Sequence, residues 1–155
     1  MRIVIIGAGP AGITAAETIR QHDRDAEVVL LSAEEAPPYS PPVLADYFLT
    51  GREAGLYWKG RDVAERLGVT HRGGRRVVSL AGGDSLRLDD GTALPFDRLL
   101  VATGSRLHAP IEGRDLEGIE SFKSLAEATS LVDRARRGDA RRAVIVGAGF
   151  IGVEV

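Results

Sequence analysis

The sequence predicts an α/β fold built on a parallel sheet, with a small antiparallel meander beside it. The main observation is a pair of G-x-G-x-x-G signatures, at residues 7–12 and 147–152. Each directly follows a short apolar run, residues 3–6 and 143–146, which is typical of a strand covered on both faces. One such signature is weak evidence, because glycine-rich turns are common. Two in the same context indicate a Rossmann-like, dinucleotide-binding architecture.

The first signature lies inside a predicted strand–helix–strand unit. The strand at residues 3–6 leads through the glycines into a helix that carries Ile13, Ala16 and Ile19 on one stripe. The apolar run at residues 28–31 predicts the second strand. This is the minimal nucleotide-binding motif of doubly wound folds.

A proline-rich loop and two short helices are expected next. Residues 36–42 hold four prolines, which predict a stiff loop rather than a helix. The following pattern predicts a helix over residues 43–49 that ends at Gly51. Another predicted helix covers residues 61–67 and ends at Gly68.

The pattern then changes to short strands. Residues 75–80, 85–88 and 92–94 are predicted as short strands, and Asp90-Gly91 predicts a hairpin turn between the last two. These three segments form the expected antiparallel meander. The continuous apolar run at residues 99–102 predicts a further strand of the parallel sheet.

The last predicted helix has clear signals at both ends. Ser124 and Glu127 have the spacing of a capping box, which predicts a helix start at this point. The helix is expected to run to about Arg137 and to stop at Gly138.

Two domains are predicted. Residues 1–110 form the first nucleotide-binding part, and residues 111–155 form a linker and the start of a second, incomplete one. Pro110, Gly113 and Gly118 punctuate the loop at this boundary. Because the sequence stops three residues after the second signature, we expect a truncated Rossmann-like fold and hence a fragment of a longer protein.

Composition narrows the function classes. The net charge of −2 argues against a nucleic-acid or membrane-surface binder, and no apolar run approaches the roughly 20 residues of a membrane span. There is no cysteine, so a disulfide framework, a thiolate metal site and dithiol chemistry are excluded within this stretch. His22, His71 and His108 lack metal-ligand spacing, so no metal is expected. With a strand starting at Arg2, a signal segment is not expected, and the predicted location is the cytoplasm.

The first glycine signature has a chemical interpretation. Gly7 permits a tight turn, Gly9 lets a pyrophosphate approach the backbone, and Gly12 lets the helix pack close to the strand. The helix N-terminus then offers free N–H donors and the positive end of its dipole. The candidate cofactor-binding residues of this turn are Gly7, Ala8, Gly9, Pro10, Ala11 and Gly12.

A ribose partner is expected about twenty positions further on, where such folds place an acidic residue. Ser32 occupies the end of the second strand, and Glu34 and Glu35 follow. Glu34 is the candidate that binds the ribose. The alternative is that Glu34 is an exposed loop acid without a ligand.

Three segments together carry a resemblance to a known family. Residues 4–12, 100–106 and 144–152 read V-I-I-G-A-G-P-A-G, L-V-A-T-G-S-R and V-I-V-G-A-G-F-I-G. This combination resembles the FAD-dependent pyridine nucleotide oxidoreductases. The resemblance implies a Rossmann-like FAD/NAD(P)-binding fold in which the first signature binds FAD and the second binds NADH or NADPH. Further implied cofactor-binding residues are Val77 beside the adenine, Ala102, Thr103 and Gly104 beside the flavin, and Gly147, Gly149 and Gly152 in the second signature.

The segment 38–51, P-Y-S-P-P-V-L-A-D-Y-F-L-T-G, resembles the ferredoxin, rubredoxin and nitrite reductase-like subgroup without redox cysteines. Pro41 and Asp46 stand where those relatives often carry an arginine and a lysine. The implied activity is electron transfer from NAD(P)H through flavin to an acceptor, such as a small iron–sulfur protein or a nitrite reductase centre. No catalytic acid or base is predicted, because the flavin carries the chemistry. Tyr39 and Trp58 are expected to be packing aromatics.

Other functions stay open at this point. One is a non-catalytic or signalling flavoprotein of the same fold. Another is an NADH oxidase or coenzyme A disulfide reductase-like enzyme, which the lack of cysteine disfavours. A third is a short nucleotide-binding module. The expected partner is a ferredoxin-like or other redox protein, with no nucleic acid and no membrane, and this stretch alone is expected to bind FAD weakly and to be inactive.

Overall fold

The computed structural model describes residues 1–106, 111–114 and 116–155. The chain divides into two compact units, the first made of residues 1–40 and 57–104, the second of residues 41–56 and 105–155. His108 and Pro110, which the sequence analysis singled out, lie outside the described residues. The predicted domain division after Pro110 therefore stays a prediction.

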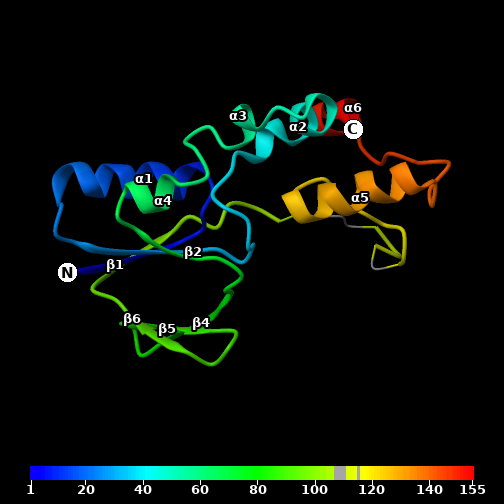
Figure 1. Cartoon of the computed structure of the whole chain (residues 1–155). Coiled ribbons are helices and arrows are strands. Elements are labelled where there is room, and N and C mark those ends of the chain that lie inside the picture. Colours follow the sequence, from blue (N-terminus) through cyan, green and yellow to red (C-terminus); the bar gives the residue numbers. More distant parts are fainter. Residues whose placement is uncertain (107–110, 115) are drawn as a thin grey trace. The chain divides into compact units, whose positions relative to one another are not determined.

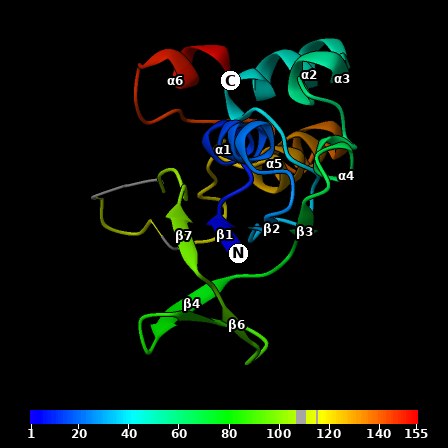
Figure 2. The ribbon, with the colours of Figure 1, turned by 90° about the vertical axis from the view of Figure 1, so that its left-hand side faces the viewer.

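The first unit is built on a four-stranded sheet. Its elements are β1 (Arg2–Ile6), α1 (Pro10–His22), β2 (Glu27–Leu31), α4 (Val63–Arg66), β3 (Thr70–Arg72) and β7 (Arg98–Val101). The strand order is β3-β2-β1-β7, and all three neighbouring pairs are parallel. Helices α1 and α4 cover one face of this sheet (Figures 1 and 2). The predicted parallel sheet is confirmed.

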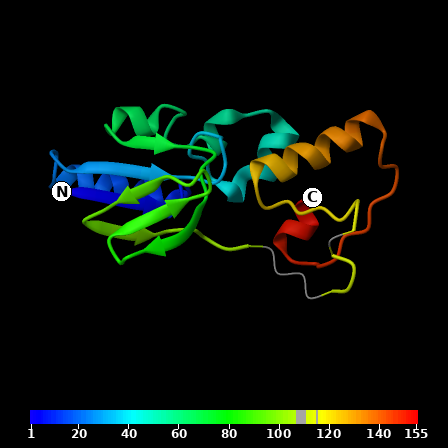
Figure 3. The same ribbon diagram turned by 90° about the horizontal axis from the view of Figure 1, so that it is seen from below.

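A three-stranded antiparallel sheet covers the other face. Its strands are β4 (Val77–Ala81), β5 (Ser85–Leu88) and β6 (Ala93–Pro95), in the order β4-β5-β6. Figure 3 views this side, with the three green strands in front of the blue β1 and β2. The predicted meander is confirmed, and Gly91 in its hairpin turn has φ +83°.

Two apolar layers hold these sheets and helices together. Side chains on successive strand residues point to opposite faces of a sheet. On β1, Ile5 packs toward Ile13 of α1, whereas Val4 packs toward Leu86 of β5. On β2, Leu30 joins the first layer and Leu31 the second. The continuous apolar runs of β1 and β2 therefore reflect coverage of both of their faces, whereas Leu100 and Val101 of β7 are exposed.

The second unit consists mainly of helices. They are the 3-10 turn η1 (Pro41–Val43), α2 (Leu44–Thr50), α3 (Glu53–Leu56), α5 (Leu125–Arg137) and α6 (Phe150–Glu154). Phe48 of α2 meets Phe122 edge to face, with 6.1 Å between ring centroids. The predicted ends are confirmed, because Gly51 and Gly138 are left-handed C-caps of α2 and α5. No helix among the described residues is long and apolar enough to cross a membrane.

The predicted strand at residues 143–146 is wrong. These residues form no regular structure, and Val144 and Val146 are 90% and 78% exposed. A strand needs a neighbour for its backbone hydrogen bonds, and the described part of the second unit contains no strand.

Candidate functional site

The first glycine turn joins β1 to α1 at the carboxyl end of the sheet. Gly7 has φ +114°, a backbone conformation that disfavours any side chain. A Cβ built there would collide with the carbonyl oxygen of Ala102 and lie 2.7 Å from its carbonyl carbon. The Gly7 N–H donates to the Leu31 carbonyl at 2.8 Å, which ties the turn to β2. Both strands beside β1 therefore fix this turn.

The other two glycines of the turn have different surroundings. Gly12 faces inward, because its Cβ would collide with the carbonyl oxygen of Gly7 and lie 3.5 Å from Ile5 Cγ2. Gly9 is the N-cap of α1, with extended backbone, and a Cβ there meets no atom within 4 Å. Gly9 is partly exposed, and Pro10 and Ala11 are exposed. The turn thus presents bare backbone and the N-terminus of a 13-residue helix to solvent.

The segment after β7 lies against the glycine turn. The Ala102 N–H donates to the Ile6 carbonyl at 2.8 Å, and the Ala102 carbonyl faces Gly7. Thr103 and Gly104 follow and are exposed, with Gly104 at φ +66°. The two motifs are almost a hundred residues apart in the sequence, yet they meet at one edge of the sheet.

Glu34 lies just beyond the end of β2, where an acid can reach a ligand held by the glycine turn. Its N–H donates to Ser32 Oγ at 3.1 Å, and its carbonyl accepts from the Gly74 N–H at 3.1 Å. Its partly buried carboxylate accepts from the Tyr39 hydroxyl, at 3.0 Å to Oε1 and 2.9 Å to Oε2. Glu35 is exposed by comparison.

Val77 is held near the same strand end. The Arg75 N–H donates to the Ser32 carbonyl at 2.8 Å, so the link from β3 to β4 crosses the end of β2. Val77 is partly buried against the second apolar layer, and the pairing of β4 with β5 is irregular between Val77 and Ser79. The Val77 side chain therefore packs into the core. Only the Val77 backbone could then face a ligand.

The second glycine turn repeats the local geometry of the first. Gly147 has φ +115°, and a Cβ on Gly152 would collide with the Gly147 carbonyl oxygen. Gly149 is the N-cap of α6 and meets no atom within 4 Å. The surroundings differ, because a Cβ on Gly147 also meets nothing within 4 Å and α6 has only five residues. The described residues around the second signature therefore form the glycine turn, but they do not form a complete binding site.

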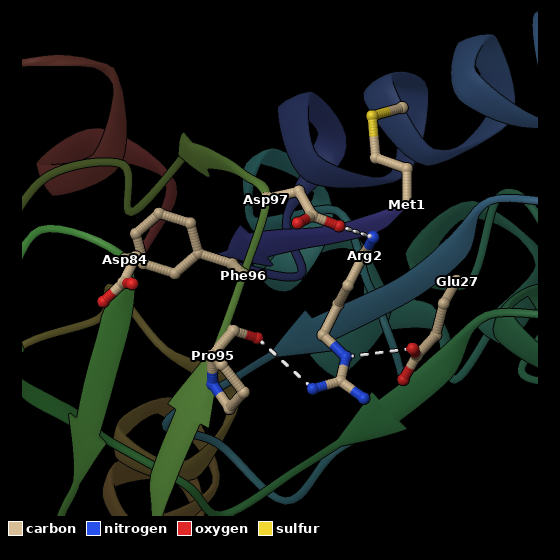
Figure 4. Close-up of a pocket in the computed structure, with 7 residues that line it drawn as sticks. All are labelled: Met1, Arg2, Glu27, Asp84, Pro95, Phe96 and Asp97. Carbon is tan, nitrogen blue, oxygen red and sulfur yellow. Dashed lines mark hydrogen bonds and ion pairs between the residues drawn. The ribbon is translucent and has the colours of Figure 1, made fainter.

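The structure also contains a notch at the opposite edge of the first unit. Its volume is about 420 Å³, and it is lined by Met1, Arg2, Glu27, Asp84, Pro95, Phe96 and Asp97 (Figure 4). Arg2 pairs with Glu27 at 2.9 Å, and its N–H donates to Asp97 at 2.6 Å. These contacts join the amino ends of β1, β2 and β7. The residues of the notch therefore stabilise the sheet and do not belong to the glycine-turn site, which lies at the carboxyl ends of the strands.

Among the other described titratable and aromatic candidates, only Tyr39 contacts a residue of this site. No three His, Cys, Asp or Glu residues gather as metal ligands within the described part of the chain. Burial lowers the pKa of His71 on β3. Trp58 packs against the first apolar layer, as expected. Tyr39 is also buried, and its hydroxyl contacts Glu34, which was not predicted from the sequence. The only sequence signal for this contact is that the two residues are five positions apart, with a proline-rich loop beginning between them.

Comparison with known proteins places the whole chain in one family. A family model described as pyridine nucleotide-disulphide oxidoreductase matches residues 1–155. The chain is 34% identical to the probable ferredoxin reductase CtmF of Castellaniella defragrans over 158 residues, which covers 99% of the chain and 38% of that protein. It is 32% identical to a rubredoxin-NAD(+) reductase of Pseudomonas putida over 159 residues, covering 100% and 41%.

A solved structure agrees with these sequence matches. The ferredoxin reductase for the CYP199A2 system from Rhodopseudomonas palustris superimposes with a TM-score of 0.83 at 30% identity. The match covers 99% of the chain and 38% of that structure. The chain therefore spans about two fifths of the length of the curated relatives it matches.

Proposed function

Because the chain belongs to the pyridine nucleotide-disulphide oxidoreductase family, we propose that its first unit holds the adenosine and pyrophosphate part of FAD. The observation that carries this proposal is the glycine turn. Gly7 and Gly12 are closed by backbone contacts, while Gly9 is open toward solvent at the N-terminus of α1. A turn of this shape accepts a pyrophosphate, because nothing stands between the ligand and the free N–H groups.

The residues of the proposed site bind different parts of the two dinucleotides. The Gly7-to-Gly12 turn binds the pyrophosphate, with Ala8, Pro10 and Ala11 shaping its backbone. Glu34 accepts from the ribose hydroxyls, and the Val77 backbone lies beside the adenine. Ala102, Thr103 and Gly104 run beside the flavin ring. Gly147, Gly149 and Gly152 begin the NAD(P)H site, which needs more of the protein than these residues.

The proposed activity of the whole protein is electron transfer from NADH or NADPH to a small redox protein. Bound flavin supplies the chemistry, since it can take a hydride and pass electrons on. The named relatives, a ferredoxin reductase and a rubredoxin reductase, support an iron–sulfur or rubredoxin-like acceptor. The 155 residues contain no cysteine, so no thiol of this stretch takes part. We also propose that the protein is located in the cytoplasm.

Gly9→Ala tests the pyrophosphate site directly. The new methyl group meets no protein atom, so the melting temperature should stay unchanged, but it would project where the phosphates approach. We expect FAD affinity to fall by about tenfold or more, the size of losing hydrogen bonds to a charged group. Fluorescence titration of the apoprotein with FAD measures this.

Gly55→Ala is the matched control, because a Cβ there also meets nothing within 4 Å and φ is not positive. It should bind FAD like the wild type. Wild-type affinity in Gly9→Ala would place the pyrophosphate elsewhere. A whole protein that takes up no FAD, or whose flavin absorbance does not bleach with NADH or NADPH, would refute the proposed function itself.

A further inference from the structure

The contact between Tyr39 and Glu34 is specific in its geometry. The phenol oxygen lies 3.0 Å and 2.9 Å from the two carboxylate oxygens, so one O–H bond is directed at the head of the carboxylate. Tyr39 is only 6% exposed. A hydrogen bond to a charged group in such a partly desolvated place is stronger than one between neutral groups.

Neighbouring groups fix the positions of both residues of the pair. The backbone of Glu34 is fixed on one side by Ser32 Oγ and on the other by the Gly74 N–H. The ring of Tyr39 is buried in a loop whose neighbouring prolines, Pro37 and Pro38, fix their own backbone angles. A glutamate side chain has several rotatable bonds. The contact with the Tyr39 hydroxyl restricts rotation about the terminal bond, the one that turns the carboxylate group.

We propose that Tyr39 is a positioning residue that orients the Glu34 carboxylate toward the ribose hydroxyls of the bound dinucleotide. This inference rests on the proposed function. A carboxylate offers about four lone-pair positions, and the tyrosine hydroxyl occupies only one side of it. The remaining positions are free to accept from a vicinal diol. Pre-orientation lowers the entropy lost when the ligand binds.

Tyr39→Phe removes the hydroxyl and keeps the ring in the core. We expect FAD affinity to fall by about tenfold, the size of one hydrogen bond to a charged group. The decisive readout is a second ligand, an FAD analogue that lacks both the 2′- and the 3′-hydroxyl of the adenosine ribose. If Tyr39 acts through Glu34 on the ribose, the variant and the wild type should bind this analogue with nearly equal affinity. A purely structural role would weaken both ligands alike, and that result would overturn the proposal.

Further variants complete the experiment. Tyr57→Phe removes the hydroxyl of another buried tyrosine and should leave the affinities for both ligands unchanged. Glu34→Gln combined with Tyr39→Phe should bind FAD no more weakly than Glu34→Gln alone, because the tyrosine then has no carboxylate to orient. If Tyr39→Phe does not fold, Tyr39→Met also removes the hydroxyl while keeping an apolar side chain, and it should show the same selectivity. Full FAD affinity in Tyr39→Phe refutes the role of Tyr39, whereas a wild-type protein without FAD refutes the proposed function.

Discussion

His71 makes the stability of the first unit depend on pH. Its Nε2 atom is buried and has no hydrogen-bond partner among the described residues, and burial lowers the pKa of its imidazole. The folded state therefore prefers the neutral ring, while the unfolded chain takes up a proton near the ordinary pKa of about 6.5. The stabilisation is present above that pH and is lost as the pH falls through it toward the folded pKa.

We expect the free energy of unfolding to decrease between pH 7.5 and 5.5, and His71→Leu to flatten this decrease. Urea denaturation at several pH values measures it. His22→Leu is the control, because His22 is exposed and its Nδ1 contacts only the Thr18 carbonyl of its own helix. If His71→Leu and the wild type lose the same free energy of unfolding over this range, another group causes the loss of stability at acidic pH.

Single residues also show which contacts can be predicted from the sequence. The roles of Gly7 and Gly12 in turn and packing follow from the signature alone, and the backbone contacts agree with them. The hydrogen bond from Tyr39 to Glu34 does not follow, because it depends on the path of the proline loop back to the end of β2. Contacts within a motif are local and predictable, whereas contacts between a motif and a loop depend on the whole fold.

At the scale of elements, Arg20 joins the ends of two helices. Its guanidinium donates to the Leu67 and Gly68 carbonyls beyond α4, at 2.7 Å and 2.9 Å. It also donates to the chain that leaves α1, with the closest contact to Ala26 at 2.8 Å. A cation at a helix C-terminus is stabilised by the helix dipole as well. One side chain therefore fixes how α1, α4 and the start of β2 meet.

Arg20→Met keeps the apolar stem but removes every donor. We expect a loss of about 2–3 kcal/mol, because partly buried carbonyls then lose a charged partner. Urea denaturation measures the change. Arg24→Met serves as the control, since the Arg24 side chain is exposed, and it should stay close to the wild type. A loss below about 0.5 kcal/mol in Arg20→Met would show that water replaces the guanidinium.

Elements differ in how well their sequences specify them. The start of α5 is predictable to the residue, because Ser124 and Glu127 form the expected reciprocal capping box. Partial burial alone raises the pKa of Glu127, but hydrogen bonds from Ser121 and Ser124 outweigh it and leave the pKa lowered. By contrast, β3 is short and polar, with no apolar pattern, and forms because the edge of β2 is free to pair with it. Local signals specify caps, whereas edge strands depend on their neighbours.

At the scale of the whole chain, nearly identical segments have different structures. Residues 4–9 read V-I-I-G-A-G and residues 144–149 read V-I-V-G-A-G. In the first copy, β1 pairs with β2 on one side and β7 on the other, and Val4 and Ile5 are completely buried. In the second copy, no strand forms and Val144 is 90% exposed. The glycine geometry is the same in both, so the turn is local while the strand is not.

Hydrogen exchange on the 155-residue chain tests this difference, with each copy as the control for the other. Amides of residues 3–6 should exchange slowly, because their bonds open only when the sheet unfolds. Amides of residues 143–146 should exchange at nearly the rate of an unfolded peptide, since no described strand accepts from them. Equal protection of the two segments would mean that the second copy finds a partner strand. The expected contrast would show that this glycine signature needs neighbouring strands before its apolar run becomes part of a sheet.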